Sequence, residues 1–248
     1  MGVPNLQTEP STAPATSLKL LREGAFSSYA PWPTGSNYVF LVQLTHPEGT
    51  CRAIYKPRSG EMPLWDFPQG TLWLREYAAY LVSQLLEWDF IPLTILRNGP
   101  RGVGSLQLFV DYMPEENYFS LRRKRVKELQ RITLFDFITN NADRKASHCL
   151  LGTDGQVWAI DHGLTFNAVP KLRTVIWDFP GRPLPQELLA QLERFRGDFL
   201  RSGSFARAFQ KLLFPREIEA FGRRVELVLA RKTFPPYGGR AGVPWPPY

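Results

Sequence analysis

Apolar and polar positions alternate over short stretches in the first part of the chain, which predicts a small antiparallel sheet. Tyr38–Leu44 and Cys51–Tyr55 are rich in β-branched and aromatic residues, and a turn at His46–Gly49 joins them. Leu18–Glu23 is short and partly alternating, so we expect it to be the first strand of a three-stranded meander. A further apolar run, Ser105–Val110, predicts a buried strand.

Longer segments carry apolar residues three and four positions apart, which predicts helices. The first is Thr71–Glu87, and a second covers about Phe119–Thr139. The pattern is helical throughout Gln186–Lys232. Between these segments we expect a polar loop and two short strands, at Asn140–His148, Cys149–Leu151 and Val157–Ile160.

This order of elements predicts an α+β fold with two lobes and a cleft between them. A small β-rich N-lobe covers residues 18–110, a mostly helical C-lobe covers residues 111–232, and the junction falls near Val110–Pro114. Residues 1–17 are rich in Pro, Ser and Thr, and we expect a disordered N-terminal tail. Residues 233–248 are rich in Pro and Gly, which favours disorder over docking onto the fold.

Composition and charge exclude several classes of protein. A chain of 248 residues with 44% hydrophobic residues can bury a substantial core, and its two cysteines exclude a disulfide framework. We expect a cytoplasmic protein without a membrane span, since the longest charge-free stretch, Gly24–Pro47, is broken by prolines and a glycine. The net charge of +7 favours anionic partners. Its densest run, Arg122–Lys127, lies on a helical pattern, so we expect a solvated helix rather than a nucleic-acid contact.

The first residues along the chain that could take part in catalysis lie in the N-lobe. Phosphoryl transfer requires a phosphate cradle, a lysine, metal-binding carboxylates and a residue that orients the nucleophile. The turn that ends in Ser36 and Asn37 offers backbone amides and small polar groups to phosphates. Lys56 lies at the end of an apolar strand, so its ammonium can enter the cleft. Glu76 on the following helix can form an ion pair with this ammonium.

The C-lobe supplies the remaining groups. Asp143 lies in the polar loop and suits a base or orienting carboxylate for an attacking hydroxyl. Arg144 and Lys145 could neutralise the transferred phosphate or pair with Asp143, and His148 could ligate a metal. Asp161, which ends the second short hairpin, could hold a magnesium ion that bridges phosphates.

Each of these features taken alone has an ordinary structural explanation, but their order along the chain is specific. In this order the chain resembles the protein-kinase-like superfamily and, within it, the phosphatidylinositol 3-/4-kinase branch. It is most similar to type II phosphatidylinositol 4-kinases and to small uncharacterised bacterial relatives. The resemblance covers about residues 18–179 and rests on Ser36–Tyr38, Tyr55–Pro57, Glu61–Pro63, Glu76–Val82, Phe90–Thr94, Asn141–Arg144 and Ile160–Phe166.

The resemblance implies that ATP binds in the cleft together with Mg²⁺ or Mn²⁺. Lys56 would contact the phosphates and pair with Glu76, Asp143 would be the catalytic aspartate, and Asp161 would bind the metal. The resemblance also implies an adenine-contacting hinge at residues 107–111, which includes Gln107 and Phe109.

The chain departs from the family pattern at the second metal position. Such kinases usually place an asparagine where this chain has His148. Imidazole is a softer donor than an amide oxygen and favours Mn²⁺ over Mg²⁺. The glycine-rich loop is also atypical, because Gly24 and Gly35 lie far apart. These departures keep open a nucleotide-binding pseudokinase or scaffold.

The acceptor is not determined by the fold. Residues 168–183 hold Lys171, Arg173 and Arg182, which could bind an anionic acceptor, but no membrane-inserting apolar loop stands out. The leading hypothesis is therefore an ATP- and metal-dependent phosphotransferase that acts on a hydroxyl of a protein or a small molecule. A phosphatidylinositol kinase, transfer of AMP instead of phosphate, and a basic nucleic-acid-binding protein are the alternatives.

Overall fold

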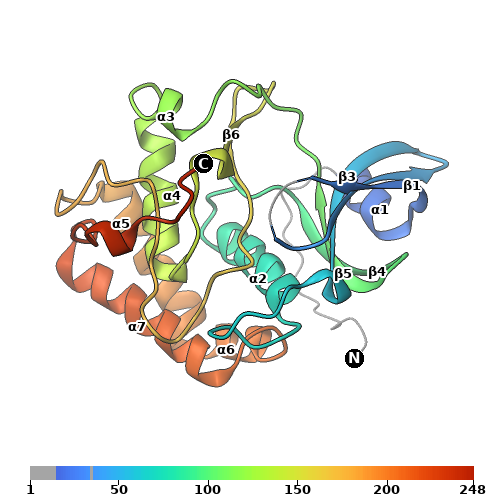
Figure 1. Ribbon diagram of the computed structural model, residues 1–248. Coiled ribbons are helices and arrows are strands. Elements are labelled where there is room, and N and C mark those ends of the chain that lie inside the picture. Colours follow the sequence, from blue (N-terminus) through green and yellow to red (C-terminus); the bar gives the residue numbers. More distant parts are fainter. Residues whose placement is uncertain (1–14, 34–35) are drawn as a thin grey trace.

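An antiparallel sheet and a helical region form the two lobes of the protein (Figure 1). The computed structural model describes residues 15–33 and 36–248. The sheet has five strands in the order β1-β2-β3-β5-β4. They are β1 (Ala25–Trp32), β2 (Val39–His46), β3 (Gly49–Pro57), β4 (Thr94–Gly99) and β5 (Gly102–Leu108).

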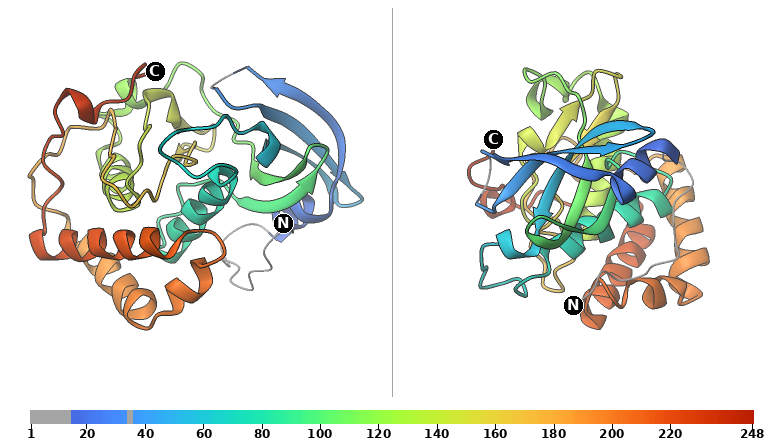
Figure 2. Two further views of the ribbon diagram at one scale, coloured as in Figure 1. Left: turned by 60° about the horizontal axis from the view of Figure 1, so that its bottom comes forward. Right: turned by 90° about the vertical axis from the view of Figure 1, so that its right-hand side faces the viewer.

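Helices pack on the sheet and make up most of the second lobe. The helix α2 (Leu72–Leu85) lies between the sheet and the helices of the second lobe, as further views show (Figure 2). The other elements are α1 (Ala15–Glu23), η1 (Arg58–Gly60), α3 (Tyr118–Leu121), α4 (Val126–Thr139), η2 (Ala146–His148), β6 (Cys149–Leu151), β7 (Val157–Ala159), α5 (Gln186–Phe195), η3 (Arg196–Arg201), α6 (Ser204–Phe209), α7 (Pro215–Arg231) and η4 (Arg240–Gly242).

The larger cluster of buried apolar side chains among the described residues extends through both lobes. In β2 the alternate residues Phe40, Val42 and Leu44 are buried, as expected for a strand with one face on the core. The same cluster includes Ala78 of α2 and Ile132 of α4. The predicted α+β arrangement is confirmed, and the shared core holds the two lobes together.

The beginning of the sheet differs from the expectation. Leu18–Glu23 is not a strand but part of α1, and β1 begins only at Ala25. Leu18 and Leu20 mimic strand alternation, but the adjacent Leu20 and Leu21 are both buried, as on the inner face of a helix. Strand β4 was not expected, because Pro92 before it and the glycine-containing stretch Asn98–Gly104 at its end indicate loops.

Two predicted helical regions are interrupted. The region expected at Phe119–Thr139 forms α3 and α4, which are separated at residues 122–125. The region expected at Gln186–Lys232 forms three α-helices and a π-helical turn, with a break before Pro215, which starts α7. Proline is favoured in the first turn of a helix and disfavoured inside one, so this break follows from the residue itself.

The segment 233–248, expected to be disordered, follows a defined path over the C-lobe. Thr233 forms a β-bridge with Pro183, and Phe234 is buried. Of the predicted N-terminal tail, residues 1–14 lie outside the described residues, and 15–17 begin α1. Among residues 15–33 and 36–248, no helix has the length and apolar character needed to cross a bilayer.

Candidate active site

Two adjoining cavities lie between the lobes. The larger measures about 600 Å³ and the smaller about 220 Å³, and Lys56, His148 and Asp161 line both. Asp143 lines only the larger one. Phe109 lines only the smaller one. The two volumes therefore form one cleft with an apolar end at the hinge and a charged end at the polar loop.

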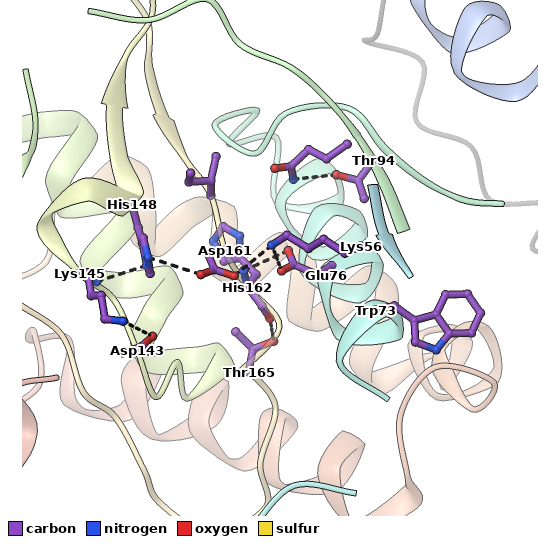
Figure 3. A network of polar contacts seen from close by, with 12 residues as sticks. Lys56, Trp73, Glu76, Thr94, Asp143, Lys145, His148, Asp161, His162 and Thr165 are labelled. Carbon is purple, nitrogen blue, oxygen red and sulfur yellow. Dashed lines mark hydrogen bonds and ion pairs between the residues drawn. The ribbon is translucent and has the colours of Figure 1, made fainter. Parts of the chain in front are cut away.

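At the centre of the cleft, one lysine meets two carboxylates (Figure 3). Lys56, near the end of β3, donates hydrogen bonds to Glu76 of α2 and, at 3.0 Å, to Oδ1 of Asp161. Oε2 of Glu76 accepts a hydrogen bond from the backbone N–H of His162 at 3.0 Å. The structure thus joins β3, α2 and the turn after β7 at the three residues that the sequence singled out.

The charges of this group depend on one another. Burial by itself would lower the pKa of Lys56, but Asp161 and Glu76 together raise it above its ordinary value. Burial also disfavours the ionised Asp161, yet the Lys56 ammonium holds the pKa of that carboxyl well below its usual range. Lys56 is therefore a cation and Asp161 an anion at neutral pH.

The backbone of Asp161 has an unusual conformation. Its φ of 61° lies in the left-handed region, which residues with a side chain rarely adopt. Such strain is often found at functional sites, where surrounding contacts maintain it. Here Arg144 Nη1 donates to the carbonyl oxygen of Ile160 at 2.8 Å, directly before Asp161.

Asp143 and Lys145 form an ion pair in the loop after α4. Asn140, with a φ of 55°, ends α4, and Oδ1 of Asn141 accepts a hydrogen bond from the backbone N–H of Asp143 at 3.0 Å. Lys145 Nζ lies 3.1 Å from Oδ2 of Asp143. Burial raises the pKa of Asp143, while Lys145 acts to lower it. A carboxylate with a raised pKa suits a proton acceptor.

Arg144 does not face the cleft, in contrast to the expectation that it would neutralise phosphate or pair with Asp143. Its side chain is fully buried, and Nε and Nη2 donate to the two carboxylate oxygens of Asp136, each at 2.9 Å. Nη2 also lies 2.7 Å from Nε2 of His162. A buried carboxylate requires a positive charge beside it, and Arg144 supplies that charge to Asp136 of α4. Arg144 therefore connects α4 to the Asp161 turn as a structural residue.

His148 faces Asp161 across the cleft. Its Nε2 lies 3.4 Å from Oδ2 of Asp161, and its Nδ1 accepts a hydrogen bond from the backbone N–H of Lys145 at 3.4 Å. Burial lowers the pKa of His148 to about 4, so the imidazole is neutral at pH 7. A neutral ring does not repel a cation held by Asp161.

These donors fit a metal that is held jointly with phosphate oxygens. No group of three or more His, Cys, Asp or Glu in the part of the chain that the structure describes could hold an ion by itself. Mg²⁺ usually keeps several non-protein ligands and binds one or two carboxylates together with substrate phosphates. Asp161 and His148 match that incomplete donor set.

The N-lobe loop lines the larger cavity. Ser36 and Asn37 both lie on its wall, whereas the preceding Thr34 and Gly35 lie outside the described residues. Oδ1 of Asn37 accepts a hydrogen bond from the backbone N–H of Met62 at 2.8 Å. Asn37 is therefore held by the segment between β3 and α2.

The smaller cavity is lined mainly by apolar side chains. Gln107 and Phe109 line it, as do the apolar side chains of Ile54 and Ile160. The Gln107 amide donates to Oγ1 of Thr94 at 2.9 Å, so this side chain is directed towards β4. Apolar walls with few polar groups are typical of small-ligand sites.

Several residues of the site were not found from the sequence. Pro246 and Tyr248 line the larger cavity, although they lie far along the chain from the polar loop. Asp136 is the buried partner of Arg144, and its position within an apolar helical run was a usable signal. Glu61, by contrast, belongs to the Glu61–Pro63 motif of the resemblance, and its Oε1 accepts a hydrogen bond from the backbone N–H of Trp73 at 2.9 Å at the start of α2.

Sequence comparisons find similarity both over most of the chain and over parts of it. The family model described as phosphatidylinositol 3- and 4-kinase matches residues 93–207. The Mycobacterium tuberculosis protein named Rv2133c is 35% identical over an alignment of 264 positions, and the alignment covers 92% of this chain and 94% of that protein. Phosphatidylinositol 4-kinase gamma 4 of rice (Oryza sativa) is 35% identical over 109 residues, which cover 36% of this chain and 19% of that kinase.

Solved structures are similar in fold at low sequence identity. A Golgi casein kinase aligns with a TM-score of 0.54 at 14% identity, over 87% of this chain and 73% of that one. Hydra Fam20, solved with a sugar, aligns with a TM-score of 0.56 at 14% identity, over 86% of each chain. Taken with the full-length match to the mycobacterial protein, these findings show that the chain has a kinase-like fold and belongs to the phosphatidylinositol 3- and 4-kinase family.

Proposed function

We propose that this protein is an ATP- and divalent-metal-dependent phosphotransferase that acts on a hydroxyl group of a protein or a small molecule. The observation that carries the proposal is the meeting of Lys56 with Glu76 and Asp161 in the cleft that also contains Asp143. A phosphoryl-transfer site needs a cation for phosphate, a metal-binding carboxylate and a base within one cavity.

The chain's own residues have separate tasks in this reaction. The apolar end of the cleft at Phe109 receives the adenine, and Lys56 binds phosphate oxygens while Glu76 keeps its ammonium in place. Asp143 accepts the proton of the acceptor hydroxyl. The acceptor oxygen forms a bond to the γ-phosphorus as the bond to the bridging oxygen breaks, and ADP leaves.

Asp161 and His148 would hold the metal. When bound, a divalent cation neutralises phosphate charge and fixes the phosphate positions. The ionised state of Asp161 and the neutral state of His148 are the protonation states that metal ligands require.

A nucleotide-binding pseudokinase is the second candidate. It is favoured by His148, which stands where related kinases use an amide, and by the small number of protein donors around Asp161. A pseudokinase would bind ATP in the same cleft without turnover.

ADP formation from ATP in the presence of Mg²⁺ or Mn²⁺ tests the proposal. We expect Asp161→Ala to lower turnover by about 10²–10³-fold, as losses of a charge-stabilising group at a reacting centre do. Asp154→Ala is the matched control, because Asp154 is exposed in the turn between β6 and β7. Equal turnover in both variants would count against the mechanism. ATP binding by the wild type without turnover under either metal would favour the pseudokinase.

A further inference from the structure

The segment after α7 returns to the active site. Its first part is held by the C-lobe: Trp177 Nε1 donates to the carbonyl oxygen of Gly242 at 3.1 Å, and the backbone N–H of Thr174 donates to the same oxygen at 2.9 Å. The rings of Trp177 and Tyr237 pack edge to face, with centroids 5.2 Å apart. These contacts anchor the segment beside the residues that follow the Asp161 turn.

Residues 246–248, which we call the tip, lie against the polar loop. The backbone N–H of Ala146 donates to the carbonyl oxygen of Pro247 at 2.9 Å, and Ala146 is next to Lys145. The ring of Tyr248 packs on Phe119 with centroids 5.5 Å apart. Ala146 belongs to η2 and Phe119 to α3, so the tip lies beside these two elements. The tip is therefore part of the active-site wall.

The tip lies at the end of the cleft that is remote from the hinge. Pro246 and Tyr248 line the larger cavity together with Asp143 and Lys145, and none of these four lines the smaller cavity at Phe109. If the adenine occupies the hinge end, an acceptor must reach Asp143 at the end where the tip lies. The N-lobe loop at residues 36–39 lines the same cavity.

The tip is also stiff. Proline fixes its own φ, so Pro246 and Pro247 allow few backbone conformations. A folded protein or a lipid in a bilayer would have to displace this segment to bring a hydroxyl to Asp143. The larger cavity, about 600 Å³, falls within the range of small-molecule sites, and it must also hold the phosphates.

We propose that the tip forms the acceptor-side wall of the cleft and restricts phosphoryl transfer to small hydroxyl compounds. This inference rests on the proposed function. The wall excludes macromolecular acceptors from Asp143, whereas water and small compounds still reach this carboxylate, because its side chain is 25% exposed with the tip in place. Removal of the tip opens the cleft to a folded acceptor.

The test compares the wild type with a variant that lacks residues 246–248 and with Tyr248→Ala. The control is Trp245→Ala, because Trp245 is 90% exposed and does not line the cleft. Three acceptors serve as probes: water, measured as ATP hydrolysis; casein; and phosphatidylinositol in phosphatidylcholine vesicles. ATP-dependent thermal stabilisation of each variant reports whether the nucleotide site is intact.

We expect removal of the tip to permit labelling of casein that the wild type lacks, and to leave ATP hydrolysis unchanged because water already reaches Asp143. Tyr248→Ala should also permit labelling of casein, and Trp245→Ala should behave as the wild type. A tip variant that still binds and hydrolyses ATP but leaves casein unlabelled would overturn the proposal. Wild-type labelling of casein or vesicles at the rate of the shortened variant would also overturn it. If the variant that lacks residues 246–248 does not fold, Tyr248→Ala provides the test of the proposal. Absence of all ATP turnover in the wild type would instead refute the proposed function, and this inference with it.

Discussion

Three consecutive residues of the polar loop have different surroundings and therefore different roles. Asp143 and Lys145 face the cleft as a partly exposed ion pair, whereas Arg144 between them is fully buried on Asp136. Successive side chains of an extended segment point in opposite directions, so one of three must point into the lobe. The charge of Arg144 holds α4 and the Asp161 turn together, whereas the charge of Lys145 forms an ion pair with Asp143 in the cleft.

The pairing of Lys145 with Asp143 predicts a pH effect. A base must be ionised, so turnover falls as the pH decreases through the pKa of Asp143. Burial raises that pKa and Lys145 lowers it, so Lys145→Met should raise it further and move the acid limb of the kcat/KM profile up by about one pH unit. Lys145→Arg keeps the charge and should leave the limb in place. An acid limb that stays unmoved in Lys145→Met would show that Asp143 is not the base.

At the scale of secondary-structure elements, two adjacent residues of α2 form ion pairs with different lobes. Glu76 pairs with Lys56 of the sheet, while the buried Arg75 pairs with Glu217 of α7 at 2.7 Å. Arg75 Nη1 also donates to the carbonyl oxygen of Thr165 at 2.7 Å, near the Asp161 turn. The position of α2, and with it the Lys56–Glu76 pair, thus depends on α7.

Removal of one partner of this buried pair should be costly. Glu217→Gln leaves the charge of Arg75 without compensation, so the free energy of unfolding should fall by about 3 kcal/mol or more. Glu219→Gln on the same helix breaks only an exposed pair with Arg223, and should cost about 1 kcal/mol at most. Urea denaturation followed by circular dichroism measures both. Similar losses in the two variants would contradict the assigned role of α7.

At the scale of the whole molecule, the cleft is built from both lobes. Its walls come from the sheet at Lys56, from the polar loop at Asp143 and from the turn at Asp161. A nucleotide held there contacts both lobes and binds only the folded chain. Ligand binding therefore adds to global stability.

ATP with Mg²⁺ or Mn²⁺ at a hundred times its Kd should raise the free energy of unfolding by about 2.7 kcal/mol. For a chain of this size, the Tm should then increase by roughly 5–10 °C. Differential scanning fluorimetry measures the shift, which Lys56→Met should reduce. Lys211→Met, which changes an exposed lysine in the helical lobe, should leave the ATP-dependent increase in Tm unchanged. A Tm that does not respond to ATP with either metal would contradict nucleotide binding in the cleft.

Local patterns were sufficient for the long elements. Leu72–Leu85 matches the helix expected at Thr71–Glu87, because fourteen residues contain enough turns to reveal helical spacing. The short segment at Leu18–Glu23 was misinterpreted, since a few leucines fit a strand and a helix equally well. Strand β4 was missed because its sheet position depends on pairing with β5, which no local pattern contains.

The sequence by itself determined the fold class through local periodicity, and the order of its motifs carried the resemblance to the family. Of the charged residues that it singled out, Lys56, Glu76, Asp143, Lys145 and Asp161 line the cleft, whereas Arg144 does not. The catalytic and metal-binding roles of Asp143 and Asp161 stay predictions. Only the tertiary structure decided that Arg144 is buried on Asp136, that Arg75 joins α7, and that Pro246 and Tyr248 border the active site. Burial and long-range contact depend on how distant segments pack, and that information lies in no single stretch of the chain.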